Sequence, residues 1–355
     1  MKQKIWLDET DAALDDAARR YTAERYRFDV RQRLSGAERR FSTAVWKDLA
    51  DMGWLGVATP EEAGGLGLRV GSICLLAEAA GRALLTEPLT SAGVVAPYLL
   101  ARGGDAVQRD ALLPRLQAGE LRIACLLEAA SVRVEAGRLH GRQQVVVDAD
   151  IADRLLVCSG DGLWLLDANA AGVTRQPYPL LDGRGAATVT FKGANATRIA
   201  SVGLADVQYA LWLAALATAA DSHGAMSAAF DLTLDYLKTR RQFGNPLGTY
   251  QALQHRAVDM YVVLGESRAV LDQAIASLQA GAPDAGRDVH AAKALIGESA
   301  RRVTQEAVQL HGGIGVTDEY AASHYLRRAR VNEQLWGSAD QHFMAFANAA
   351  PAAIA

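Results

Sequence analysis

Apolar residues recur at helical spacing through the first third of the chain. In the segment Phe41–Val57, four of them would share one face of a helix: Val45, Trp46, Leu49 and Met52. Gly53 follows directly and is typical of a helix end. The next stretch, Thr59–Leu68, is rich in glycine, but no GxGxxG pattern follows a strand there, so we expect a loop and no dinucleotide fingerprint. The pattern predicts an α-helical domain over residues 1–118.

Near residue 119 the pattern changes to short leucine or β-branched runs that are separated by turn residues. Within Arg138–Asp167, two such runs flank Gly160 and Gly162, which is typical of a hairpin. The segment Ala186–Phe191 predicts a further strand because it is short and contains β-branched residues. We therefore expect a small antiparallel β domain over residues 119–200.

Long amphipathic segments return in the last part of the chain. They predict three long helices, over residues 205–241, 250–280 and 288–310. Gly244 and Pro246 lie between the first two and mark a turn. Residues 201–355 therefore form a second helical domain, and the order of helical, β and helical parts predicts an α+β multidomain fold.

Composition and charge exclude several classes of protein. The net charge of -3 gives no basic surface for nucleic acid. The three cysteines lie far apart, which favours buried thiols in a reducing, cytoplasmic setting over disulfides or a zinc site. The longest apolar run, Tyr209–Ala220, is far shorter than the roughly 20 residues that span a bilayer, so we expect a buried helix and no membrane segment. The acidic N-terminus predicts no signal peptide, and the histidines show no metal-binding spacing.

Three stretches carry side chains that could bind or transform a ligand. In Lys238–Gln254, Arg240 could donate two hydrogen bonds to a phosphate, although a basic helix end and a turn explain the same residues. The glycines of Gln309–Tyr320 would allow a ligand close to the backbone, or make a tight turn between helices. In Val331–His342, a helix breaks and Ser338 could cap a new one. Local chemistry alone supports no more than a protein that binds a phosphorylated ligand.

Taken together, and in this order, the three stretches resemble the acyl-CoA dehydrogenases. The resemblance extends over roughly residues 20–345 and includes WKDLADMGWLGVATPEEAGGLGL, LLPRLQAGE, GRQQVVVDADIADRLLV, RRQFG and QLHGGIGVTDEY. It implies an N-terminal helical domain, a middle β domain and a C-terminal four-helix bundle. It also implies FAD as cofactor, an acyl-CoA thioester as substrate, an acceptor of the electron-transfer flavoprotein type, and a dimer or a dimer of dimers.

The resemblance implies a catalytic glutamate that this chain lacks. The base must take the α-proton of the thioester, and the family places it just before the glycine of the last stretch, where this chain has Trp336. Some members place it on the first long C-terminal helix, where this chain has Ala214. Asp221 lies two turns after Ala214 and is a substitute candidate, although an ion-paired structural role is favoured for it. Glu333 is expected to be solvated or to pair with Arg330.

The residues that the family uses to hold FAD are retained on one side only. In the family, each FAD lies between two chains, and the half-site that one chain lends to its neighbour is kept here: Arg240, Phe243, Gln251, Gln309, Gly312 and Gly313. The half-site for the chain's own FAD is altered in the loop Leu127–Arg133, at Val145 and Val147, and at Asp340, although Ser338 keeps a hydroxyl.

Three hypotheses follow from this asymmetry. In the first, the chain is an accessory subunit that lends its half-site to a catalytically complete family member, with Trp336 and the two valines filling its own cleft. Such a pair would resemble the two-gene heteromers of bacterial steroid and branched-acid breakdown. In the second, it is a self-sufficient homomeric enzyme that uses Asp221 as base. In the third, it is a flavin-free scaffold or binding protein. A nucleic-acid-binding role is disfavoured by the acidic balance.

Overall fold

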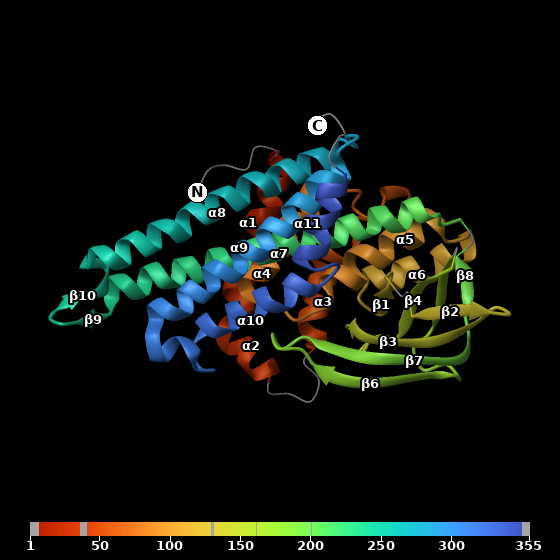
Figure 1. Ribbon diagram of the computed structural model, residues 1–355. Helices are drawn as coiled ribbons and strands as arrows, with labels where there is room; N and C mark the ends of the chain where they lie inside the picture. The colour runs from red at the N-terminus through yellow and green to blue at the C-terminus, as the bar shows by residue number, and fades with distance from the viewer. Residues whose placement is uncertain (1–6, 36–40, 129–130, 161, 200, 350–355) are drawn as a thin grey trace. The chain divides into compact units, whose positions relative to one another are not determined.

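The computed structural model describes residues 7–35, 41–128, 131–160, 162–199 and 201–349 (Figure 1). Contacts group residues 1–31, 70–85 and 215–355 into one unit, called here the bundle unit. Residues 32–69 and 86–214 form a second unit, called here the sheet unit. The expected helical, β and helical order of the chain is confirmed. The division into three domains at residues 118 and 200 stays a prediction.

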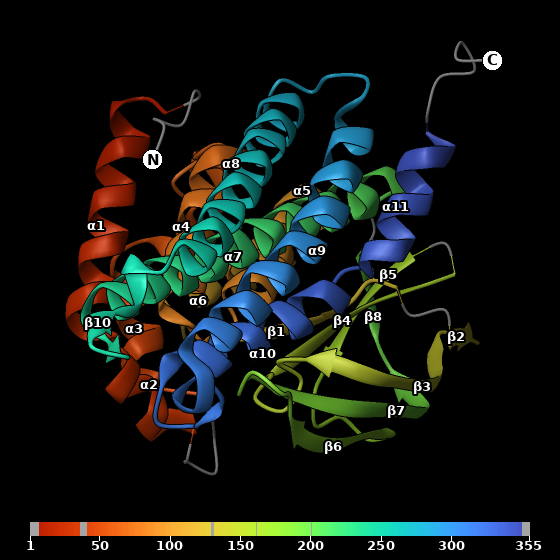
Figure 2. The same ribbon diagram turned by 60° about the vertical axis from the view of Figure 1, so that its left-hand side comes forward.

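The bundle unit is built of long helices. Its elements are α1 (Glu9–Arg25), α4 (Val70–Ala83), the greater part of α7 (Leu204–Thr239), α8 (Gln251–Gln279), α9 (Ala285–His311), the 3-10 turn η5 (Gly312–Val316), α10 (Ala321–Gln334) and α11 (Ala339–Asn348), with the first residues of α2 (Phe28–Ser35). The three long helices predicted from the pattern are thus confirmed as α7, α8 and α9. Helices α8 and α9 run side by side, and α10 and α11 also pack on α9 (Figures 1 and 2).

Helices α4 and α7 approach each other at two glycines. A Cβ atom at Gly81 would lie 1.9 Å from the carbonyl oxygen of Asp221, and one at Gly224 would lie 2.0 Å from the carbonyl oxygen of Glu78. Any side chain at either position would push the helices apart. This backbone contact fixes the position of Asp221 relative to α4.

The sheet unit combines short helices with two four-stranded sheets. Its helices are α3 (Thr43–Asp51), η1 (Trp54–Gly56), η2 (Glu61–Ala63), the π-helical η3 (Leu89–Val95), α5 (Ala96–Gly103) and α6 (Ala106–Gln117). Its strands are β1 (Ile123–Leu126), β2 (Val132–Glu135), β3 (Arg138–Val147), β4 (Arg154–Ser159), β5 (Gly162–Asp167), β6 (Val173–Pro179), β7 (Gly185–Asn195) and β8 (Thr197–Ile199). The strand orders are β1-β4-β5-β8 and β2-β3-β7-β6. The inner faces share an apolar core that includes Leu139, Leu155 and Phe191.

The strands and the helix end predicted for this unit are confirmed, and the structure adds one parallel pair of strands. Strands β4 and β5 form the expected hairpin, with Ser159 opposite Gly162. The segment Ala186–Phe191 lies inside β7, and α3 ends two residues before Gly53, whose φ is 77°. All pairs in this unit are antiparallel except β1 with β4, which is parallel, an arrangement that the long segment between them allows. Among the described residues, no helix combines the length and apolar character needed to cross a membrane.

Candidate flavin half-site and the empty base position

The first part of the candidate half-site is a tight hairpin after α7. Strands β9 (Arg241–Gln242) and β10 (Asn245–Pro246) are joined by Phe243 and Gly244, whose φ angles are 52° and 85°. Two left-handed residues in a two-residue loop match the right-handed twist of the strands. The turn leaves the Phe243 ring 90% exposed, with one edge contact to Tyr250 at 6.4 Å between centroids. The hairpin therefore presents an aromatic face that its own unit does not cover.

Arg240 precedes this hairpin and has an open guanidinium. Its backbone is fixed at both ends, since its N–H donates to Tyr236 at 2.8 Å and its carbonyl accepts from Leu247 at 2.8 Å. Its side chain is exposed, and the described part of the chain gives the guanidinium no hydrogen bond or ion pair. A guanidinium of this kind can receive an anionic oxygen without first breaking an ion pair.

The second part of the half-site lies where α9 ends. Gln309 is exposed there, and Gln251 is exposed at the first turn of α8. Gly312 adopts φ 63°, and a Cβ at Gly312 or Gly313 would meet no atom within 4 Å. The backbone at these glycines is open to close approach by a ligand.

A ring cluster that the sequence reasoning missed holds α7 to the end of α9. The His311 ring lies 4.5 Å from that of Tyr236 and 5.0 Å from that of Tyr320, and its Nδ1 lies 2.7 Å from the carbonyl oxygen of Ala307. Burial lowers the pKa of His311. Because Tyr236 lies one turn before Arg240, this cluster joins the two parts of the half-site. Tyr236 lies 75 and 84 positions before His311 and Tyr320 along the chain, so local spacing gave no signal for the contact between α7 and the end of α9.

Trp336, where the family resemblance implies the base, lies in a short loop between α10 and α11. Trp336 adopts φ 56° and Gly337 adopts φ 96°, so two consecutive residues are left-handed. Ser338 then starts α11 as a capping box, in which its Oγ accepts from Gln341 N–H at 3.2 Å and its N–H donates to Gln341 Oε1 at 2.8 Å. The capping alternative for Ser338 is confirmed, and its contact with a cofactor stays a prediction.

Asp221 is held by two residues of α10. Arg328 donates to both carboxylate oxygens, from Nε to Oδ1 at 2.9 Å and from Nη2 to Oδ2 at 2.6 Å. Asn332 donates a further hydrogen bond to Oδ1 at 2.6 Å. The carboxylate is buried, with 7% of the residue exposed. This geometry favours the ion-paired reading, because a general base needs a lone pair free to face the substrate and three hydrogen bonds already engage both carboxylate oxygens.

The other candidate positions offer no base with better geometry. Ala214 is fully buried on α7 and carries only a methyl group. Glu333 pairs with Arg330 at 2.8 Å, as expected, and also lies 3.9 Å from Arg301.

Two of the positions at which the family resemblance implies contact with the chain's own FAD, Val145 and Val147, lie in the sheet unit. Val145 on β3 is 53% exposed within the structure, and Val147 is half-buried. In the altered loop, Leu127 is buried, and residues 129 and 130 lie outside the described ranges. The Ser131 hydroxyl donates a hydrogen bond to the carbonyl oxygen of Arg142 at 2.6 Å, which ties the loop to β3. No side chain at 145 or 147 offers a hydrogen bond to a flavin ring.

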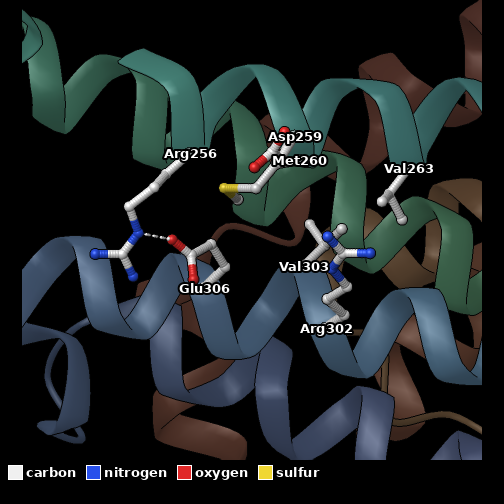
Figure 3. Close-up of a pocket in the computed structure, with 7 residues that line it drawn as sticks. All are labelled: Arg256, Asp259, Met260, Val263, Arg302, Val303 and Glu306. Carbon is white, nitrogen blue, oxygen red and sulfur yellow. Dashed lines mark hydrogen bonds and ion pairs between the residues drawn. The ribbon is translucent and has the colours of Figure 1, made fainter. Parts of the chain in front are cut away.

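A groove of about 250 Å³ lies between α8 and α9 on the bundle unit (Figure 3). Met260 and Val263 from α8 face Val303 from α9 across its floor, and an ion pair between Arg256 and Glu306 crosses one end. Next to it, α8 exposes three large apolar side chains: Val258, Tyr261 and Val262. An exposed apolar stripe beside a groove is typical of a protein–protein contact.

Comparison with known proteins identifies the family. Residues 8–120 match the model of the acyl-CoA dehydrogenase N-terminal domain, and residues 202–350 match that of the acyl-CoA dehydrogenase C-terminal domain. The chain is 32% identical over 302 residues to acyl-CoA dehydrogenase IpdE2 of Mycolicibacterium smegmatis, covering 85% of this chain and 86% of that protein. It is 30% identical over 331 residues to acyl-CoA dehydrogenase FadE27 of Mycobacterium tuberculosis, covering 86% and 87%. The chain belongs to the acyl-CoA dehydrogenase family, whose reaction is an oxidation at a CH–CH bond.

Solved structures agree with the fold. One is a steroid ACAD variant of Tcur3481-Tcur3483, with a TM-score of 0.88, 32% identity, and coverage of 96% of this chain and 97% of that one. Another is the ChsE4-ChsE5 complex from Mycobacterium tuberculosis, with a TM-score of 0.90, 24% identity, and coverage of 96% and 97%. The second likeness concerns the fold alone.

Proposed function

We propose that this chain is an accessory subunit of a heteromeric, FAD-dependent acyl-CoA dehydrogenase. It lends one half of the FAD site to a partner of the same family and carries out no proton abstraction itself. The observation that carries the proposal is the contrast between an open half-site on the bundle unit and an empty base position. FAD, when bound, supplies the acceptor for the hydrogen that leaves the β-carbon.

The retained half-site fits a flavin dinucleotide in its chemistry. Arg240 offers an unpaired guanidinium for a phosphate oxygen, and Phe243 offers an exposed ring for stacking. Gly312 and Gly313 leave space for backbone approach, and Gln251 and Gln309 add exposed amides. All six residues are exposed on one unit, as a site completed by a second chain requires.

The chain's own half-site fits the same cofactor poorly. The isoalloxazine edge needs hydrogen-bond partners in a dry site, and each one lost costs about 1–3 kcal/mol. Val145 and Val147 supply none. Trp336 has an indole that only donates, so it cannot take the α-proton of a thioester, and Asp221 is engaged with Arg328 and Asn332. The base for the reaction then belongs to the partner.

The groove between α8 and α9 supports a partner of the same fold. Met260 and Val263 of its apolar floor, and the neighbouring exposed residues of α8, lie on the helix that begins at Gln251, so this face shares a helix with the lent half-site. The likeness to a steroid ACAD at 32% identity supports an acyl-CoA from steroid breakdown as substrate class. The family relation supports an electron-transfer flavoprotein as acceptor. The three free cysteines support a cytoplasmic setting.

The first prediction concerns flavin in the assembly. We expect the chain purified alone to be colourless and the co-expressed pair to hold FAD. We expect Arg240→Ala and Phe243→Ala each to lower the FAD content of that pair at least tenfold, because the phosphate donor or the stacking ring is lost. Absorbance at the flavin band and the mass of the native assembly measure both.

Arg20→Ala is the matched control, because Arg20 is an exposed arginine on α1 outside the half-site, and it should leave FAD content unchanged. A yellow homomer with one FAD per chain would overturn the accessory role and favour the homomeric enzyme. A colourless chain that never gains FAD with any partner would favour the scaffold.

A further inference from the structure

A lysine of α9 donates hydrogen bonds to backbone carbonyls before and after Trp336. Lys293 is buried, with 1% exposed, and its ammonium donates to three backbone carbonyls: those of Asn332 at 3.0 Å, Glu333 at 3.4 Å and Gly337 at 2.9 Å. One side chain thus ties the last turn of α10 to the residue that follows Trp336. An ammonium has three protons to donate, so three acceptors match its capacity.

A pair of histidines holds the carbonyl between these contacts. His342 on α11 places Nε2 2.8 Å from the carbonyl oxygen of Trp336, and its Nδ1 lies 2.9 Å from Nδ1 of His290 on α9. Because a carbonyl only accepts, Nε2 of His342 must carry the proton. In the neutral ring, Nδ1 of His342 is then an acceptor, and Nδ1–H of His290 donates to it.

The backbone of this loop lies against the imidazole of His342. A Cβ on Gly337 would lie 2.6 Å from Nε2 of His342, so the imidazole is pressed against the chain. Trp336 itself is left-handed, a conformation that residues with a Cβ adopt only when their surroundings impose it. Lys293 and His342 hydrogen-bond to the backbone of this loop, and His290 contacts His342.

We propose that Lys293, His290 and His342 form a brace that holds the Trp336 loop in one conformation, so that the indole is a rigid plug at the usual base position. The inference rests on the proposed function, in which this position has no catalytic task. These three are positioning residues, since they act through the backbone of Trp336. A loop braced in this way does not open and close as a lid.

Fluorine NMR of protein labelled with 5-fluorotryptophan tests the brace. The chain has six tryptophans, and the resonance of Trp336 is identified by its loss in Trp336→Phe. We expect one sharp Trp336 line in the parent chain. In His342→Phe, which keeps a ring but cannot donate to the carbonyl, we expect this line to split or to broaden at least twofold while the other five stay in place. His290→Phe should have the same effect, because the donor to His342 is lost.

His255→Phe is the control, because His255 is exposed on α8 and outside the brace. The lines of Trp46, Trp54, Trp164 and Trp212 report folding of the sheet unit, and far-UV circular dichroism reports folding of the helical bundle unit. Lys293→Met provides a second variant if His342→Phe unfolds. A Trp336 line that is already split in the parent, or that stays sharp in the folded brace variants, would overturn the proposal. The measurement uses no FAD, so its failure is separate from failure of the accessory role.

Discussion

At the residue scale, the arrangement around Asp221 decides between a structural and a chemical carboxylate. A buried carboxylate that accepts two hydrogen bonds from one guanidinium and one from an amide is part of the packing of α7 against α10. Breaking such a pair from one side is costly because the remaining charge stays buried. The same residue as a catalytic base would affect turnover and leave the fold intact.

The Asp221→Asn variant separates these two roles. We expect the free energy of unfolding to fall by about 3–5 kcal/mol, since the buried Arg328 loses the charge of a carboxylate that pairs with it through two hydrogen bonds. Urea unfolding followed by far-UV circular dichroism measures the change. Asp235→Asn, an exposed aspartate on the same helix, is the control and should stay within about 0.5 kcal/mol of the parent. An unchanged unfolding midpoint together with lost dehydrogenase activity of a homomer would instead make Asp221 the base.

At the scale of elements, the crossing of α4 and α7 sets the geometry of the bundle. The two glycines of this crossing allow one helix backbone to touch the other, and Asp221 lies directly at the contact. The position of its carboxylate relative to α10 therefore depends on a residue of α4 that is 140 positions away along the chain.

A pair of glycine substitutions tests this crossing. Gly81→Ala should lower the free energy of unfolding by about 1–3 kcal/mol, because the Cβ of the alanine would overlap the carbonyl oxygen of Asp221. Gly265→Ala on α8 should instead raise it by about 0.5–1 kcal/mol, since its Cβ would meet no atom and alanine favours a helix. Thermal and urea unfolding of both variants measure the difference. Equal effects at the two sites would argue against close contact of α4 with α7.

At the scale of the whole molecule, the free energy of unfolding should depend on pH through the two histidines of the brace, His290 and His342. Burial lowers the pKa of His342 to about 4, from an ordinary value of 6.5, and also lowers that of His290. A histidine that is neutral when folded takes up a proton on unfolding, so protons favour the unfolded chain. The contribution is complete above pH 6.5 and is lost as the pH falls toward about 4.

Comparison of the parent with His342→Phe isolates this contribution. Between pH 6.5 and about 4 we expect the parent to lose stability more steeply than the variant, by about 1.4 kcal/mol per pH unit. Urea unfolding at a series of pH values gives both curves. Parallel curves for the two proteins would show that His342 titrates normally in the folded chain. His255→Phe should follow the parent.

The sequence by itself determined the order of helical and β parts, the three long helices and the β4–β5 hairpin, because apolar period and turn residues act over a few neighbouring positions. The family resemblance further predicts the half-site residues and the absence of the usual base, since those depend on residue identity, and both stay predictions. Only the tertiary structure decided the partners of Asp221, the ring cluster at His311 and the brace on Trp336. Each joins residues tens of positions apart, and local spacing carries no information on contacts that helix packing creates.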